Sequence, residues 1–155
     1  MDPAVTATHI QALREQVAPD LFKGFNQRNF PSTTMPALAL AELAYRSSLQ
    51  TGEIVSLALR DALFEEGIDI SRPALLSEIA ELSHLDVSAG LDETLVREWW
   101  SAGRVRGVEG SPHFFCQDGD AFCPSLDIER DPNGRLILKR NAARLGVFLS
   151  GCFNN

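Results

Sequence analysis

Apolar residues recur at helical spacing from the N-terminus to about residue 103, and this periodicity predicts a series of helices. Thr8 and Gln11 form a capping box at the start of the first helix. Pro19 and Gly24 end or bend this helix, because proline removes a backbone donor and glycine is typical of helix ends.

The second and third helices are separated by a predicted break at Thr51-Gly52. Thr34 caps the second helix, and Pro36 lies in its first turn, where a missing N–H leaves no helical hydrogen bond unmade. The third helix covers residues 53–66 and ends at Gly67.

Two shorter helices complete the series. Ser71 caps the fourth helix, and Asp92 caps the fifth, which covers residues 93–102. We find no internal repeat and no low-complexity linker, so we place no internal boundary and expect one domain over residues 1–155.

After residue 103 the pattern changes to short runs that are typical of strands. Residues 113–117 and 121–126 are predicted to pair as an antiparallel hairpin and to form a small sheet. Asp118-Gly119-Asp120 supplies the turn between them.

A second turn signal, Asp131-Pro132-Asn133-Gly134, precedes the apolar run Leu136-Ile137-Leu138. This run is either a short strand or the approach to a last helix. Asn141 can cap that helix, which would pack on the sheet through Leu145, Phe148 and Leu149.

Composition and charge argue against several classes of protein for this chain. The formal net charge of −7 argues against nucleic acid and anionic membranes as partners, because both attract basic patches. No apolar run is long enough to cross a bilayer, and the first residues lack the features of a secretion signal. Three cysteines are an odd count and do not suggest a disulfide framework, so we expect a cytoplasmic protein. Cys152 lies beside the C-terminus, where we expect it to be a packing residue.

Two segments resemble one known family. Gly107-Val108-Glu109-Gly110-Ser111-Pro112-His113-Phe114-Phe115 resembles the cis-proline segment of DsbA-like thioredoxin-fold proteins, and Phe30-Pro31-Ser32-Thr33-Thr34-Met35-Pro36-Ala37-Leu38-Ala39 resembles their helical insert. The resemblance covers about residues 20–150. It implies an α+β, thioredoxin-like fold, with residues 36–102 as the insert and residues 104–155 as the C-terminal part of the core.

The family's first strand, its Cys-x-x-Cys helix and its second strand have no counterpart in this sequence. The resemblance therefore implies a thiol-disulfide oxidoreductase that is incomplete or catalytically degenerate in this chain. A non-enzymatic peptide-binding or dimerisation module is one alternative. A glutathione-dependent isomerase or transferase, similar to 2-hydroxychromene-2-carboxylate isomerase, is another, because fold alone does not decide function. We expect no cofactor and no metal, and an extended peptide or a thiol compound as the partner.

The substrate-binding candidates are Ser111, Pro112, His113 and Trp100. The resemblance implies a cis Ser111-Pro112 bond whose backbone groups face an extended peptide, whereas an ordinary trans proline at a strand start is the alternative. His113 could act as a general acid or base, but a polar side chain at the strand start is the preferred interpretation. Trp99 and Trp100 point about 100° apart on a helix, so one of them is expected to line a groove near the proline loop and the other to be buried.

Cys116 and Cys123 flank the predicted hairpin turn and are weak catalytic candidates. A turn at Gly119-Asp120 places them opposite each other, about 4.5–5.5 Å apart at Cβ, where a disulfide would be strained. A turn at Asp118-Gly119 instead places Cys123 opposite Phe114. Two small buried hydrophobic residues are the preferred interpretation, and no zinc-ligand spacing is present.

The missing strands would leave the strand after Pro112 with an unpaired edge. A second copy could pair with this edge, residues 2–8 could cover it, or the chain could be the C-terminal part of a longer protein. The core of the strand, Phe114-Phe115-Cys116, is apolar on both faces, as in an interior strand. We therefore expect a two-fold homodimer that buries this edge or the helical groove beside it.

Overall fold

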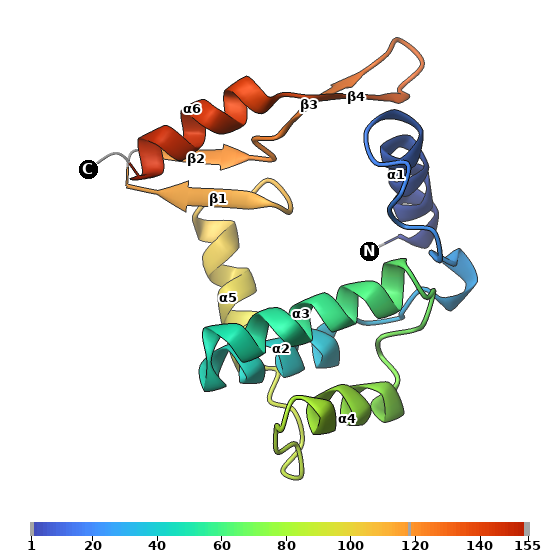
Figure 1. The fold of residues 1–155 in the computed structure, drawn as a ribbon, viewed down its shortest axis with the longest axis vertical. Helices are drawn as coiled ribbons and strands as arrows, with labels where there is room; N and C mark the ends of the chain where they lie inside the picture. The colour runs from blue at the N-terminus through green and yellow to red at the C-terminus, as the bar shows by residue number, and fades with distance from the viewer. Residues whose placement is uncertain (1, 118, 154–155) are drawn as a thin grey trace. The chain divides into compact units, whose positions relative to one another are not determined.

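The computed structural model describes residues 2–117 and 119–153, which form a mixed α+β structure (Figure 1). The described residues contain six α-helices, one short 3-10 helix and two antiparallel two-stranded sheets. The elements in chain order are α1 (Pro3–Gln16), η1 (Gln27–Asn29), α2 (Met35–Ser47), α3 (Leu49–Phe64), α4 (Pro73–Leu82), α5 (Thr94–Val105), β1 (His113–Cys116), β2 (Gly119–Phe122), β3 (Leu126–Arg130), β4 (Leu136–Arg140) and α6 (Ala142–Phe153). The expected α+β class is confirmed, whereas a thioredoxin-like arrangement stays a proposal.

The chain divides into two compact units, which we describe separately. The helical unit contains residues 1–7 and 21–102, and the hairpin unit contains residues 8–20 and 103–155. No strand lies within residues 36–82, all of which the structure describes, so the expected helical character of this segment is confirmed. The prediction of a single domain is not tested by this division and stays a prediction.

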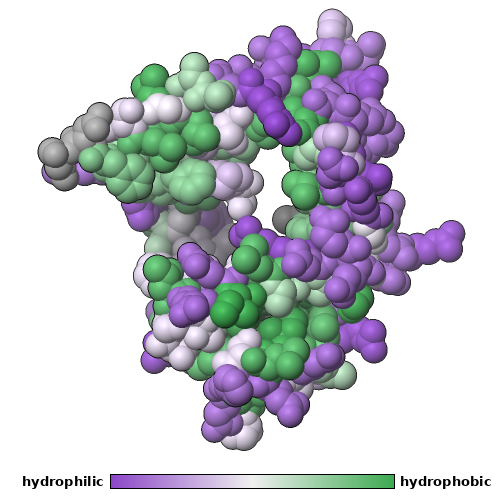
Figure 2. Space-filling model, in the orientation of Figure 1, coloured by the Kyte–Doolittle hydropathy of each residue, from purple (hydrophilic) through white to green (hydrophobic). Residues whose placement is uncertain are grey.

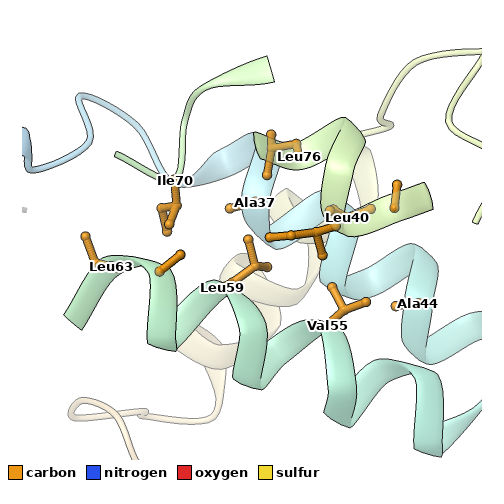
Figure 3. Packing of buried hydrophobic residues seen from close by; sticks show 11 residues of the cluster. Ala37, Leu40, Ala44, Val55, Leu59, Leu63, Ile70 and Leu76 are labelled. Carbon is orange, nitrogen blue, oxygen red and sulfur yellow. The ribbon is translucent and has the colours of Figure 1, made fainter. Parts of the chain in front are cut away.

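The helical unit is built on one apolar core. α2 and α3 pack against each other, α4 packs on both, and their inward side chains point toward one another (Figure 3). Leu40 and Val55 are completely buried at the centre, as expected for apolar residues repeated on one helical face. The buried core residues are Ala37, Leu40, Ala44, Val55, Leu59, Ala62, Leu63, Ile70, Leu76, Ile79 and Ala80.

The predicted break at Thr51-Gly52 is wrong, because both residues lie in the first turn of α3. Ser48 caps this helix: its hydroxyl accepts a hydrogen bond from the Thr51 N–H at 3.0 Å. Gly52 is buried beneath the ring of Tyr45 on α2, and a Cβ at this position would collide with that ring. The glycine therefore allows α2 and α3 to approach closely and does not end a helix.

Two predicted helix starts are also wrong. α1 begins at Pro3 rather than Thr8, and the Asp2 carboxylate accepts a hydrogen bond from the Ala4 N–H at 2.8 Å. α4 has Arg72 at its N-cap, while Ser71 donates both its N–H and its hydroxyl to the carboxylate of Asp69. Ser71 thus forms a local turn with Asp69 and does not cap α4 as the sequence predicted.

The hairpin unit contains two separate hairpins. β1 pairs with β2 in the register Cys116↔Gly119, and β3 pairs with β4 in the register Arg130↔Leu136. The expected strand over residues 121–126 is therefore divided, since β2 ends at Phe122 and Leu126 begins β3. Cys123 has a positive φ of 44° and Pro124 follows it, so this point cannot continue a ladder.

The second hairpin is tied to residues 8–20 by polar contacts. The Gln16 side chain donates to the Leu136 carbonyl at 3.0 Å and accepts from the Leu138 N–H at 2.9 Å. The Arg140 guanidinium donates to the Val17 carbonyl. Ala12, Val17 and Leu138 form the small buried cluster beneath these contacts. The run Leu136-Ile137-Leu138 is thus part of a strand.

The final helix, α6, is anchored at its start but buries none of its residues completely. Asn141 caps it, as expected, by accepting a hydrogen bond from the Arg144 N–H at 2.8 Å. Figure 2 shows apolar residues on the exposed surface of this helix. Among the described residues, every helix is too short or too polar to cross a membrane.

Candidate functional site

The proline loop enters β1 through a close backbone approach. A Cβ on Gly110 would lie 2.8 Å from the ring of Phe122, so only glycine fits beneath that ring. The Ser111–Pro112 peptide bond is cis, which confirms the expectation from the resemblance. The Pro112 carbonyl then accepts a hydrogen bond from the Cys123 N–H at 2.8 Å, which joins the loop to the end of β2. Ser111 and Pro112 are exposed.

The two faces of β1 have different contacts. Phe114 and Cys116 share one face, and both meet α6: the Phe114 ring lies 6.1 Å from that of Phe148, measured between centroids. His113 and Phe115 share the other face, where their rings stack with centroids 4.5 Å apart. The guanidinium carbon of Arg106 lies 4.1 Å from the centroid of Phe115, in a cation–π contact.

The outer edge of β1, opposite β2, is unpaired among the described residues. β2 is the partner of β1, and the bond from Cys123 to the Pro112 carbonyl fixes which groups face it. Backbone groups alternate between the two edges of an antiparallel strand, so those of His113 and Phe115 point away from β2. This row of donors and acceptors is what a further strand would need.

The side chain of His113 is held at both ring nitrogens. Nδ1 accepts a hydrogen bond from the Glu109 N–H at 3.1 Å, so Nε2 carries the hydrogen and donates to the Asp120 carboxylate at 2.7 Å. The side chain is only 2% exposed. This geometry supports the structural interpretation of His113, because neither nitrogen is open to a substrate proton.

Neither proposed register of the hairpin is correct, and Cys116 is not the unbridged buried residue that was the preferred interpretation. Cys116 lies opposite Gly119, and Cys123 falls beyond the end of β2. Asp118, in the predicted turn, lies outside the described residues. Cys116 instead forms a disulfide with Cys152 of α6, with a Cα–Cα distance of 5.4 Å that is usual for such a bond. Cys152 is therefore a bridging residue and not a simple packing residue.

Cys123 is a free, buried thiol. Burial raises its pKa above the ordinary value of 9.0, although the nearby Arg144 guanidinium acts in the opposite direction. A thiol in this state is mostly protonated at neutral pH and is a poor nucleophile. The preferred interpretation of Cys123 as a small buried hydrophobic residue is thus supported.

Arg144 is a structural residue that the sequence did not single out. Its guanidinium donates to the carbonyls of Phe122 at 2.8 Å and Leu126 at 3.2 Å, and lies 3.7 Å from the Asp127 carboxylate. It holds the junction between β2 and β3. The sequence carried no signal for this role, because an arginine on a predicted helix is most often solvated.

Trp100, the fourth substrate-binding candidate, belongs to the helical unit, whereas Ser111, Pro112 and His113 belong to the hairpin unit. Trp99 and Trp100 both line a pocket of about 820 Å³ formed by α2, α3 and α5. The expected burial of one of them is wrong, and a groove near the proline loop stays a prediction. Their exposed fractions are 63% and 64%, so neither is a core residue.

Comparisons with known proteins return nothing for this chain: no family model, no curated protein and no solved structure matches it. Within residues 2–117 and 119–153, no group of three or more His, Cys, Asp and Glu side chains is arranged to hold a metal ion. The function of the site must therefore be argued from its own geometry.

Proposed function

We propose that this chain is a DsbA-like protein whose hairpin unit binds an extended polypeptide along the outer edge of β1. On this proposal the chain supplies the substrate-binding side of a thiol-disulfide oxidoreductase. Its 155 residues contain no Cys-x-x-Cys pair, so this chain by itself binds polypeptide and does not exchange a dithiol.

The observation that carries the proposal is the unpaired outer edge of β1, where the backbone groups of His113 and Phe115 point away from β2. An extended peptide can add to such an edge by main-chain hydrogen bonds, with little demand on its sequence. The neighbouring Ser111 and Pro112 are exposed, and the strand behind the edge is fixed by β2 on one side and by the disulfide to α6. A rigid edge loses little conformational entropy on binding.

The order of elements is a second support. α5, the proline loop, the β1–β2 hairpin and a last helix packed on one face of β1 are what the resemblance implies for the C-terminal part of a thioredoxin-like core. The insertion of β3 and β4 between β2 and α6 departs from the simple hairpin-and-helix expectation. The alternative of a glutathione-dependent isomerase receives no separate support, because both nitrogens of His113 are occupied.

A second copy of the chain is the alternative to a peptide as the partner of the outer edge of β1. The exposed fraction of Phe114 is 47%, which is large for a strand residue with an aromatic side chain and agrees with an association surface. Strand pairing about a two-fold axis would satisfy the same backbone groups. The homodimer expected from the sequence is therefore kept as the alternative proposal.

Strand addition is tested with a labelled peptide of alternating valine and threonine, flanked by lysines. The control is the same peptide with its backbone nitrogens methylated at alternate residues. The parent peptide should bind in a fluorescence anisotropy titration. The methylated peptide should not bind, because it lacks the backbone N–H donors along one edge. Equal binding of the two peptides would overturn strand addition.

Sedimentation at micromolar protein concentration separates the two occupants. If the protein is a dimer and excess peptide dissociates it, the outer edge of β1 is the dimer interface and the peptide competes for it. Phe115→Lys should weaken association, because it removes the ring stacked on His113, whereas Glu81→Lys on α4 should have no effect. A monomer that binds the peptide supports the first proposal alone.

The absence of a dithiol is tested by insulin reduction with dithiothreitol. We expect this chain to give a rate near the uncatalysed background, because its free cysteine is buried and protonated. A rate comparable with that of a thioredoxin, lost in Cys116→Ser, would make Cys116 and Cys152 a redox pair. The disulfide gives no support to a cytoplasmic location, since stable disulfides are rare there, and that location stays a prediction.

A further inference from the structure

The pocket that contains both tryptophans has the size and composition of a small-molecule site. Its volume of about 820 Å³ lies within the range of about 300–1,000 Å³ that is common for such sites. Tyr45, Trp99 and Trp100 form its aromatic part, with exposed fractions of 42%, 63% and 64%. The Tyr45 ring also packs over Gly52, yet each of the three residues leaves more than two fifths of its surface exposed, and this exposed aromatic surface can cover a ligand.

Two opposite charges lie in the lining of this pocket. Glu42 is half-buried on α2, and Arg60 is exposed near the C-terminal end of α3. Neither makes a hydrogen bond or an ion pair with another residue that the structure describes, and they do not pair with each other. A third charge, Arg97, is already neutralised by Glu93 at 2.7 Å.

An unpaired carboxylate and an unpaired guanidinium in one aromatic pocket complement a ligand that carries both charges. A carboxylate accepts from an ammonium group, and Tyr and Trp faces add cation–π attraction to it. A guanidinium binds a carboxylate through parallel N–H groups. A ligand with a single charge would leave one of the two protein groups without a partner.

We propose that this pocket binds a small zwitterionic ligand with an apolar body, of the class of amino acids and short peptides. Glu42 binds the ammonium group, Arg60 binds the carboxylate, and the aromatic residues cover the apolar body. The inference does not depend on the proposed function, because every residue that carries it lies in the helical unit.

The two tryptophans of the chain both line the pocket, so intrinsic fluorescence reports on it directly. The probe is the dipeptide leucyl-leucine, titrated beside its N-acetyl form, its C-terminal amide and the form blocked at both ends. We expect a saturable shift of emission to shorter wavelength with the free dipeptide. Each singly blocked form should bind about tenfold or more weakly, because one charged hydrogen bond is lost.

Two variants assign the charges. Arg60→Gln should abolish the preference for the free carboxylate and keep the preference for the free amine, and Glu42→Gln should do the reverse. Glu53→Gln, an exposed change on α3 outside the pocket, should leave both preferences intact. Trp99→Phe and Trp100→Phe, measured singly, show that the signal comes from the pocket.

A merely structural role for these charges would weaken all four probe forms equally in both variants, and that result would overturn the proposal. Equal binding of all four forms to the unchanged chain would also overturn it, since the groove would then recognise only apolar groups. The absence of any saturable shift at millimolar dipeptide would reject the pocket as a site for this ligand class.

Discussion

The helical unit and the hairpin unit are stabilised by different forces. In the helical unit eleven buried apolar residues form one core shared by three helices. In the hairpin unit the shared buried cluster has three residues, and side-chain hydrogen bonds and a disulfide connect the elements. Apolar burial is non-directional and tolerates small shifts, whereas each polar link requires its own geometry. The hairpin unit therefore owes its shape to a small number of specific bonds, each of which a single substitution can remove.

The two units also differ in charge. The helical unit contains six basic and thirteen acidic residues, whereas the hairpin unit contains eight of each. The entire net charge of −7 therefore resides in the helical unit. The hairpin unit, whose charges balance, does not repel an acidic polypeptide, whereas the acidic helical unit does.

The largest effect is expected at the centre of the helical core. Leu40→Ala should lower the free energy of unfolding of the helical unit by about 2–5 kcal/mol, because the side chain is completely buried. The measurement is urea unfolding followed by circular dichroism. Leu57→Ala makes the same chemical change at a site that is 58% exposed and should change stability by about 0.5 kcal/mol or less. Equal losses in the two variants would contradict the description of the core.

The next effect belongs to the hairpin unit. Cys152→Ser removes a disulfide between residues that are 36 positions apart, which should cost about 2–4 kcal/mol. Amide hydrogen exchange should show this loss in residues 103–153 and no change in α2 to α4. Reduction of the unchanged protein should reproduce the loss, whereas Cys123→Ala should keep the disulfide. A loss spread over both units would show that they unfold as one.

Two glycines lie beneath aromatic rings, Gly52 under Tyr45 and Gly110 under Phe122. A smaller effect on stability is expected when Gly52 is changed. Gly52→Ala should destabilise the helical unit by about 1–3 kcal/mol, because the added Cβ displaces the ring. In a Tyr45→Ala background the same change should instead stabilise by about 1 kcal/mol, since alanine is the better helix former. Thermal unfolding of the four proteins of this cycle gives the coupling, and additive effects would refute the contact.

The smallest effect is a dependence on pH. The hydrogen bond from Gln11, with a further one from Arg135, holds the pKa of Glu15 below its ordinary value of 4.5. Because the pKa of Glu15 is lower in the folded protein than in the unfolded chain, its carboxylate stabilises the fold at pH values above the ordinary pKa of 4.5. This contribution disappears as the pH falls through the folded-state pKa. Glu15→Gln should therefore flatten the acid side of the stability profile slightly. Glu129→Gln, an exposed change on β3, should leave the profile unaltered.

Local sequence signals predicted the helical unit better than the hairpin unit. Helical periodicity placed α2 to α5 to within a few residues, because their apolar faces repeat over several turns. Gly52 was misjudged, since a glycine that ends a helix and a glycine that admits a ring have the same local sequence. Only the position of Tyr45 on the neighbouring helix separates the two cases.

In the hairpin unit the proline loop, β1 and its antiparallel pairing with the next strand were predicted, but the register of that pairing and the disulfide to α6 were not. The Cys116–Cys152 bond joins residues 36 positions apart, and the only bridge that the hairpin pattern suggested was to the nearer Cys123, which was itself judged less favourable than two unbridged cysteines. The division between β2 and β3 could have been found, because Pro124 in the middle of a predicted strand is itself a sign against a continuous ladder. The pocket around Trp100 could not, since its lining comes from three helices.

The disulfide makes residues 116–152 a closed covalent ring, and the turn from Asp131 to Arg135, exposed at residues 132–135, lies at its far end. That turn is held by the Asp131 carboxylate, which accepts hydrogen bonds from the N–H groups of Asn133 and Arg135. A protease that cuts there leaves two pieces still joined through sulfur, with β3 and β4 still paired. The nicked protein therefore stays a single molecule until a reductant divides it, and new sequence inserted at this turn leaves both ends of the ring in place.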